Sequence, residues 1–304
     1  MSQTTGRFAE PAMAGAMRQV AERINVPTDD AILLRLTNNA VFALPGAGLV
    51  IRITRSLGLQ YRVNKVVQLG GWFEQVDAPT IRLAPGINQP LRVGDMLATV
   101  WRYVPPLRPA PNVEDLGRVL REFHGLPRPA FALPVWDPVQ DARARIDDAE
   151  ALDDHDRAVL VRWCDDLEPR LAGLQARGGW RLVHGDAHVG NLLRQSENRV
   201  VLCDFDPTCL GPWQVDLVAV AVGEIRFGRA GAHRSLAEAY GYDVKSDPDW
   251  PLLREARELK MVAAAVPLLA SGPGVADEFR TRLTSVVRGD EGLRWTPFAD
   301  VRRL

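Results

Sequence analysis

The stretch LVHGDAHVGNLL at residues 182–193 is followed closely by VVLCDFD at residues 200–206. Apolar residues flank both segments, yet each carries a tight run of polar side chains: His184, Asp186, His188 and Asn191 in the first, and Asp204 and Asp206 in the second. A carboxylate at the end of an apolar strand is costly unless a cation compensates it. The sequence therefore raises the question of which cation lies beside Asp204, and what that cation does there.

A β-hairpin is predicted between the two polar runs. The polar turn QSEN at residues 195–198 separates two apolar strands. Because a hairpin brings its outer ends together, Asn191 and Asp204 are expected to meet at one point. Their side chains offer only oxygen ligands, which suits a hard cation such as Mg²⁺. The ion compensates Asp204 and leaves Asp186 free to accept a hydrogen bond or a proton, a combination that predicts phosphoryl transfer.

The order and spacing of these residues match a kinase template, in which a base Asp precedes a metal-binding Asn by five positions and a further metal-binding Asp follows. HGDAHVGN followed by DFD resembles the aminoglycoside phosphotransferase/choline kinase family, the small-molecule branch of the protein-kinase-like fold. GPWQVDLV at residues 211–218 and LREFHG at residues 120–125 are similar to two further elements of that family. The resemblance covers roughly residues 30–245, and the chain beyond is only generically helical.

The resemblance implies roles for the residues of the second half. Asp186 is then the catalytic residue, which accepts or orients the proton of the attacking hydroxyl, and Asn191 and Asp204 hold Mg²⁺ on the nucleotide phosphates. His184 braces the loop, and Asp216 hydrogen-bonds the catalytic-loop backbone from beneath.

The resemblance also implies an α+β, two-lobed fold, with a small antiparallel-sheet N-lobe over residues 1–104 and a mainly helical C-lobe over residues 105–304. The N-lobe covers the nucleotide, and the C-lobe carries the catalytic loop, the metal site and the acceptor pocket. The pattern of the chain agrees with a sheet of five strands and one helix, YRVNKVVQLGGWF. The predicted strands are AILLRLT, AVFALP, LVIRITR, TIRLAP and LATVWRYV. The Pro-rich stretch VPPLRPAPN at residues 104–112 separates them from a helical second part.

Four residues of the first part are implied to bind the nucleotide. Arg52 in LVIRITR falls where such kinases place the basic residue that touches the phosphates, although IRITR also fits a strand whose Arg52 faces solvent. Asn39 lies in TNNAVF at residues 37–42, the place of the phosphate-covering hairpin. Arg102 and Tyr103, in the hinge segment VWRYV, are expected to meet the adenine edge through their backbone.

The sequence also departs from the family pattern. A kinase helix normally supplies a Glu to pair with the basic residue, yet residues 60–73 contain no acidic residue, and Lys65 lies about where the Glu is expected. Either another carboxylate pairs with Arg52, or the phosphates alone orient it. The phosphate-covering hairpin lacks GxGxxG, and DFD replaces DFG. Asp206 thereby adds a carboxylate that could bind a second ion or a cationic substrate.

The predicted function is an ATP- or GTP-dependent phosphotransferase that moves the γ-phosphoryl group to a hydroxyl of a small molecule. The resemblance implies an aminoglycoside-like antibiotic, an amino alcohol or a sugar, and leaves the acceptor, the nucleotide and the oligomeric state open. Acidic residues of the helical part are candidates to line an acceptor pocket, or are ordinary solvated charges: Asp147, Asp148, Glu224, Asp249, Glu258 and Asp277.

Two alternatives stay open. The missing helix Glu motivates a nucleotide-binding pseudokinase or regulatory protein on the same fold. The HxxxH spacing of His184 and His188, with Asp204 as a third ligand, motivates a metal-dependent hydrolase.

Composition narrows the setting. Apolar residues make up 46% and charged residues 25% of the 304 residues, the balance of a soluble globular protein. A net charge of -1 without a basic run argues against nucleic acid as a partner. The apolar stretch MVAAAVPLLA at residues 261–270 is too short for a membrane span, and the N-terminus lacks a secretory pattern. Three cysteines without CxxC spacing agree with a cytoplasmic protein.

Overall fold

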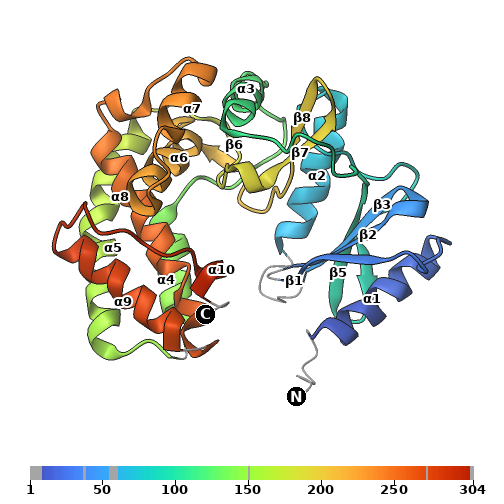
Figure 1. The fold of residues 1–304 in the computed structure, drawn as a ribbon, viewed down its shortest axis with the longest axis horizontal. Coiled ribbons are helices and arrows are strands. Elements are labelled where there is room, and N and C mark those ends of the chain that lie inside the picture. The colour runs from blue at the N-terminus through green and yellow to red at the C-terminus, as the bar shows by residue number, and fades with distance from the viewer. Residues whose placement is uncertain (1–8, 37–38, 55–60, 150, 272, 302–304) are drawn as a thin grey trace. The chain divides into compact units, whose positions relative to one another are not determined.

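The computed structural model describes residues 9–36, 39–54, 61–149, 151–271 and 273–301. By its contacts the chain divides into two compact units. The first comprises Met1–Pro111, Pro129–Phe131 and Gly190–Pro207, and the second Asn112–Arg128, Ala132–Val189 and Thr208–Leu304 (Figure 1). The lobe boundary predicted between residues 104 and 105 stays a prediction.

The first unit is built on a five-stranded antiparallel sheet in the order β1-β2-β3-β5-β4. Its strands are β1 (Ile32–Leu36), β2 (Asn39–Leu44), β3 (Leu49–Thr54), β4 (Leu91–Val93) and β5 (Met96–Arg102), with the 3-10 helix η1 (Pro45–Ala47) between β2 and β3. The predicted small antiparallel sheet is thus confirmed for four of its five segments.

The predicted strand TIRLAP is wrong. Residues 80–85 form isolated bridges only, and the true fourth strand is β4. The Arg82 side chain explains why this segment is not a regular strand. It donates hydrogen bonds to the carbonyls of Ala78 and Thr80 at 2.7 and 3.0 Å. The segment instead makes single backbone hydrogen bonds to two strands. Ile81 N–H donates to Leu202 O of β8 (Arg199–Leu202) and Ala84 N–H donates to Val100 O of β5, each at 2.9 Å.

The two faces of this sheet have different neighbours. Helix α1 (Glu10–Arg23) packs one face, where its Met13 and Val20 join Ile51 and Ile53 in a single buried cluster. Since successive strand residues point to opposite faces, Arg52 lies on the other face. That face also receives α2 (Tyr61–Gln75), which contacts β5.

Helix α2 continues through Gly70 and Gly71, as predicted, and ends at Gln75, just beyond the predicted stretch. A Cβ atom on Gly70 would lie 2.7 Å from Cγ of Leu83, so the missing side chain permits a close approach there. The glycine is therefore used for packing and does not end the helix.

The hairpin predicted from the opening motif is confirmed. Strands β7 (Leu192–Ser196) and β8 (Arg199–Leu202) pair antiparallel, beginning with Leu192 opposite Leu202. Just beyond this pair, Cys203 N–H donates to Asn191 O at 2.9 Å and extends the backbone pairing at the end opposite the turn. Asn191 is consequently bonded through its backbone to the residue that precedes Asp204.

The second unit is mainly helical, with one small antiparallel pair, β6 (Arg181–Val183) with β9 (Cys209–Gly211). Its longer helices are α3 (Val113–His124), α4 (Pro138–Asp147), α5 (Asp154–Ala176), α6 (Gln214–Phe227), α7 (Ala232–Tyr240), α8 (Trp250–Ala263) and α9 (Pro273–Val287). Shorter turns are η3 (Val189–Asn191), which ends in the first unit, η4 (Val244–Ser246), η5 (Val266–Ser271) and α10 (Phe298–Val301). None of the helices within the described residues is long and apolar enough to span a membrane.

Two helices differ from the sequence pattern. The segment DARARIDDAEAL predicts a helix over residues 141–152, but α4 begins at Pro138 and ends at Asp147. Asp137 caps it by accepting from Gln140 N at 2.8 Å, and Pro138 suits the first turn. Helix α7 was not predicted, because its pattern is short. It is held by α3, where a Cβ on Gly117 would lie 2.8 Å from Cβ of Ala239.

A buried ion pair between Arg226 on α6 and Glu258 on α8 stabilises the C-terminal part of the second unit. Arg226 Nε donates to Glu258 Oε1 at 2.8 Å, and the two side chains are only 2% and 7% exposed. The guanidinium also donates to Asp290 O at 2.7 Å and stacks 4.6 Å from the ring centroid of Trp295. Helices α6 and α8 and the C-terminal segment thus share one cation.

We expect Glu258→Gln to lower the free energy of unfolding by about 3–5 kcal/mol, because it leaves the Arg226 cation buried without its counter-ion. The exposed pair of Arg143 with Asp165, at 2.7 Å, provides the control. Asp165→Asn should change stability by at most about 1 kcal/mol, since water screens that pair and Glu168 still binds Arg143. Urea unfolding measures both. Equal effects of the two variants would contradict the assignment.

Candidate functional site

The DFD segment is anchored by its aromatic residue. Phe205 is 1% exposed, and its ring centroid lies 4.8 Å from that of Phe73 on α2 and 6.1 Å from that of Trp101 on β5. Asp204 has a φ of 70°, a left-handed conformation that Asp tolerates better than most residues. The buried ring therefore fixes the backbone that carries the two flanking carboxylates.

Asp206 pairs with Arg52. Arg52 Nη2 donates to Asp206 Oδ2, and Asn39 Nδ2 donates to the same oxygen at 3.3 Å. The Arg52 side chain is 11% exposed, so the alternative of a solvent-facing strand residue is wrong. Residues 37 and 38 of the predicted phosphate-covering hairpin lie outside the described residues.

Helix α2 has no acidic residue before Glu74, and at the position where the Glu was expected it contributes a cation instead. Lys65 on α2 donates from Nζ to the backbone oxygen of Asp206 at 2.6 Å. The basic residue of β3 thus has its carboxylate partner in the DFD segment and not on the helix. This arrangement answers what replaces the missing helix Glu: Asp206 does.

Two arginines compensate Asp204. Arg35 Nη1 donates to Asp204 Oδ2 at 3.3 Å, and Arg52 Nη2 lies 3.7 Å from Asp204 Oδ1. Arg35 was missed by the sequence reasoning, because β1 showed only that it alternates with apolar residues. Asn191 lies at the end of the hairpin opposite the turn and is 2% exposed. The donor set of one carboxylate and one amide oxygen fits Mg²⁺, and the role of these two residues as its ligands stays a prediction.

In the second unit, a buried carboxylate holds the loop that follows β6. Asp216 is fully buried and accepts from the backbone N–H groups of His184 and Gly185 at 2.7 and 2.8 Å. His124 Nε2 lies 3.0 Å from the same carboxylate. Burial alone raises the pKa of Asp216, but the hydrogen bond and charge of His124 and the His184 backbone outweigh it and hold the pKa below the ordinary 3.8. Asp216 is therefore charged and orients the HGD backbone.

His184 supports the same loop from within. Its side chain is fully buried, and Asp186 N donates to its Nδ1 at 3.3 Å. Thr208 Oγ1 donates to the backbone oxygen of His184 at 3.3 Å. The zinc alternative named His184, His188 and Asp204; no group of three or more His, Cys, Asp or Glu side chains is assembled for a metal within the described residues.

Asp186 lies against two cations of α8. Arg257 Nη1 donates to Asp186 Oδ1 at 3.1 Å, and Lys260 Nζ lies 3.5 Å from the same oxygen. Burial raises the pKa of Asp186, but the charges of Lys260, Arg257 and His188 outweigh it and hold the pKa well below its usual range. The sequence reasoning missed both α8 residues, whose only signal is their spacing of three along REARELK, which places them on one helix face.

The hinge residues are engaged within the first unit. Arg102 N–H donates to Arg82 O at 2.9 Å, and Tyr103 N–H donates to Gly48 O at 2.8 Å. The Arg102 side chain pairs with Glu74 at 2.9 Å. The predicted contact of the Arg102 and Tyr103 backbone with adenine stays a prediction. Because both N–H groups donate within the first unit, such a contact would use the carbonyl groups.

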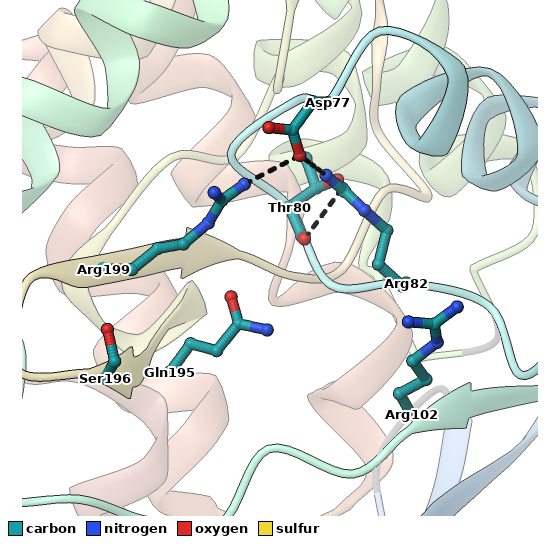
Figure 2. Close-up of a pocket in the computed structure, with 7 residues that line it drawn as sticks. All are labelled: Asp77, Thr80, Arg82, Arg102, Gln195, Ser196 and Arg199. Carbon is teal, nitrogen blue, oxygen red and sulfur yellow. Dashed lines mark hydrogen bonds and ion pairs between the residues drawn. The ribbon is translucent and has the colours of Figure 1, made fainter.

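A hollow of about 370 Å³ opens on the first unit (Figure 2). It is lined by Asp77, Thr80, Arg82, Arg102, Gln195, Ser196 and Arg199. Figure 2 shows Arg82 and Arg199 converging on Asp77, at 2.8 and 3.1 Å. Each arginine of the hollow has a carboxylate partner, and of the predicted site residues only Arg102 lines it.

Comparison with known families decides the relationship. The sequence model described as the phosphotransferase enzyme family matches residues 38–258. The chain belongs to this family. The matched range includes every site residue predicted from the sequence and makes the protein a small-molecule phosphotransferase, as expected from the opening motif.

Solved structures of kinase-like phosphotransferases share the fold of this family member. Amicoumacin kinase hAmiN, in complex with AMP-PNP, Ca²⁺ and Ami, aligns at 13% identity over 94% of this chain and 98% of its own, with a TM-score of 0.65. The GDP and kanamycin complex of APH(2")-IIia aligns at 17% identity over 91% and 99%, with a TM-score of 0.62. A choline/ethanolamine kinase family protein from Mesorhizobium loti aligns at 17% identity over 92% and 96%, with a TM-score of 0.57.

These likenesses confirm the predicted α+β protein-kinase-like fold. At such low identities they establish the fold alone. A search among curated protein sequences finds no match.

Proposed function

We propose that this phosphotransferase moves the γ-phosphoryl group of Mg²⁺-bound ATP or GTP to a hydroxyl of a small molecule. The observation that carries the proposal is the cluster within the first unit, where Arg52 is held by Asp206 beside Asp204. Asp186 precedes Asn191 by five residues, and a chain of that length spans at most about 18 Å. The chain itself therefore keeps the base within at most that distance of Asn191.

Asn191 and Asp204 would hold Mg²⁺, which supplies charge neutralisation for the β- and γ-phosphate oxygens when it is bound. Arg52 binds the phosphates in this proposal. Asp206 and Asn39 restrict the guanidinium to the face of the sheet where the DFD segment lies. Lys65 restrains the same segment through the Asp206 carbonyl.

Asp186 orients the acceptor hydroxyl in the proposed reaction. As the bond between the acceptor oxygen and the γ-phosphorus forms, the bond from that phosphorus to the β–γ bridging oxygen breaks, and the hydroxyl proton passes to Asp186. The lowered pKa of Asp186 makes it a weak base at equilibrium. It therefore takes the proton late, once bonding to phosphorus has acidified the hydroxyl, as a loose transition state allows.

The pseudokinase alternative rested on the missing helix Glu. The pairing of Asp206 with Arg52 removes that motive, because a carboxylate already orients the basic residue. Asp186, Asn191 and Asp204 are all retained as well. Both observations favour an active transferase.

The proposal is tested by following transfer of labelled γ-phosphate. We expect ATP or GTP to raise the melting temperature only when Mg²⁺ is present, and label to appear on a member of a panel of hydroxylated antibiotics, amino alcohols, sugars and hydroxy acids. Mg²⁺-dependent stabilisation without transfer to any acceptor would favour the pseudokinase. Stabilisation by neither nucleotide would contradict both functions.

A further inference from the structure

The charged surroundings of Asp186 come from α8. Arg257 and Lys260 are 17% and 25% exposed, whereas Asp186 is 36% exposed, so the cations are the more buried partners. Lys260 Nζ also donates to Gly185 O at 2.6 Å, which holds it beside the loop. Two positive side chains thus lie beside the carboxylate that the acceptor hydroxyl reaches in the proposed function.

Arg257 has donor capacity to spare. A guanidinium carries five N–H donors, and within the described residues that of Arg257 bonds only Asp186, through Nη1. Its Nε is buried and has no hydrogen-bond partner in the described part of the chain. A buried N–H without an acceptor is unfavourable, and carboxylate or phosphate oxygens satisfy a guanidinium through two neighbouring N–H groups. The unpartnered Nε therefore points to an anionic ligand.

The acidic residues on and near α8 do not neutralise the charges of Arg257 and Lys260. Glu255 pairs with Arg170 at 2.7 Å and Glu258 with Arg226 at 2.8 Å, so both carboxylates of the helix have other partners. Asp141 on α4 acts on Lys260 through its charge, but Asp141 is exposed, and water screens it.

Three of the other acidic candidates for an acceptor pocket lie beside cations elsewhere in the second unit. Glu224 pairs with Lys245 at 2.8 Å, and Asp249 pairs with Arg177 at 2.5 Å. Asp277 lies 3.8 Å from Arg280. An acid-lined pocket for a cationic acceptor, one of the two interpretations of these residues, finds no support in their contacts.

We propose that the acceptor is a hydroxylated anion, whose carboxylate or phosphate group binds Arg257 and Lys260 while its hydroxyl meets Asp186. This inference rests on the proposed function, since it assigns the acceptor of the same site. An ammonium group at this position would meet the two cations directly. An anion bound through Arg257 Nε and its neighbouring N–H group satisfies the guanidinium, while Nη1 keeps its bond to Asp186.

The test uses acceptors that share a skeleton and differ in one charged group. The three-carbon set is glycerate, glycerol 3-phosphate, glycerol and 3-aminopropane-1,2-diol, and the hexose set is glucuronate, glucose 6-phosphate, glucose and glucosamine. Transfer of labelled γ-phosphate is measured for each compound, and binding to the full-length protein with Mg²⁺ and ADP is measured by calorimetry. The carboxylate and phosphate arms distinguish the two kinds of anion.

We expect an anionic member to have the highest kcat/KM or the tightest binding in its set. Arg257→Gln should lower kcat/KM or the binding affinity for that compound by about a hundredfold, mostly through KM or Kd. It should affect the values for the neutral counterpart far less. Arg170→Gln is the matched control, because it removes the same charge from the neighbourhood of α8, where Arg170 pairs with Glu255. It should leave the selectivity unchanged.

Preference for the neutral or the ammonium compound, or an equal response of all compounds to Arg257→Gln, would overturn the inference. Failure of every anionic compound both to react and to bind would overturn it too. These outcomes are separate from failure of the proposed function, because Mg²⁺-dependent binding of ATP or GTP and transfer to neutral or cationic acceptors would survive them.

Discussion

Asp186→Asn is expected to lower kcat by about a thousandfold, within the range for loss of a general base. Asparagine keeps the shape of the side chain but cannot take up the hydroxyl proton. It also removes the negative charge that Arg257 and Lys260 contact at 3.1 and 3.5 Å. Steady-state transfer of labelled phosphate to the accepted substrate measures the loss.

Nucleotide affinity supplies the control for this variant. Asp186 forms ion pairs with Arg257, Lys260 and His188 of the second unit, whereas Arg52 and the DFD carboxylates belong to the first. The Kd of Mg²⁺-bound nucleotide should therefore stay within about threefold of wild type, a difference below 1 kcal/mol. A variant that turned over at the normal rate would show that another group handles the proton.

The local parts of the site were predictable from the sequence because they depend on short-range rules. The QSEN turn between two apolar strands determines the β7–β8 hairpin, and the hairpin brings Asn191 to the backbone of Cys203. The sheet strands followed from β-rich runs in the same way. TIRLAP has the composition of a strand, but the Arg82 side chain binds the carbonyls of Ala78 and Thr80, a preference that composition does not reveal.

The partners of the charged residues were not predictable, because they lie far apart in the chain. Arg52 and Asp206 are separated by 154 residues, and Arg257 and Asp186 by 71. The sequence showed that residues 60–73 contain no acidic residue and that DFD has an extra carboxylate. It could not show that one compensates for the other, since that depends on how α2 and Phe205 pack.

The two carboxylates of DFD are expected to differ in their effect on the response to Mg²⁺ when each is changed to Asn. Asp204→Asn should abolish the effect of Mg²⁺ on nucleotide binding and lower kcat by at least about a thousandfold, since a metal ion contributes several kcal/mol to such reactions. Asn tolerates the φ of 70° at this position, so the change tests the ligand and not the backbone. Titration of nucleotide with and without Mg²⁺ measures the response.

Asp206→Asn is the matched comparison for Asp204→Asn, because it removes an equal charge two residues away. It should keep the response to Mg²⁺ and lower kcat/KM by about 10- to 100-fold, through loss of the pairing that orients Arg52. Adding Arg52→Gln should then cost little more, because residues that act as a pair are not additive. If Asp206→Asn instead abolished the response to Mg²⁺, Asp206 would be a metal ligand, and the orientation of Arg52 would need another carboxylate.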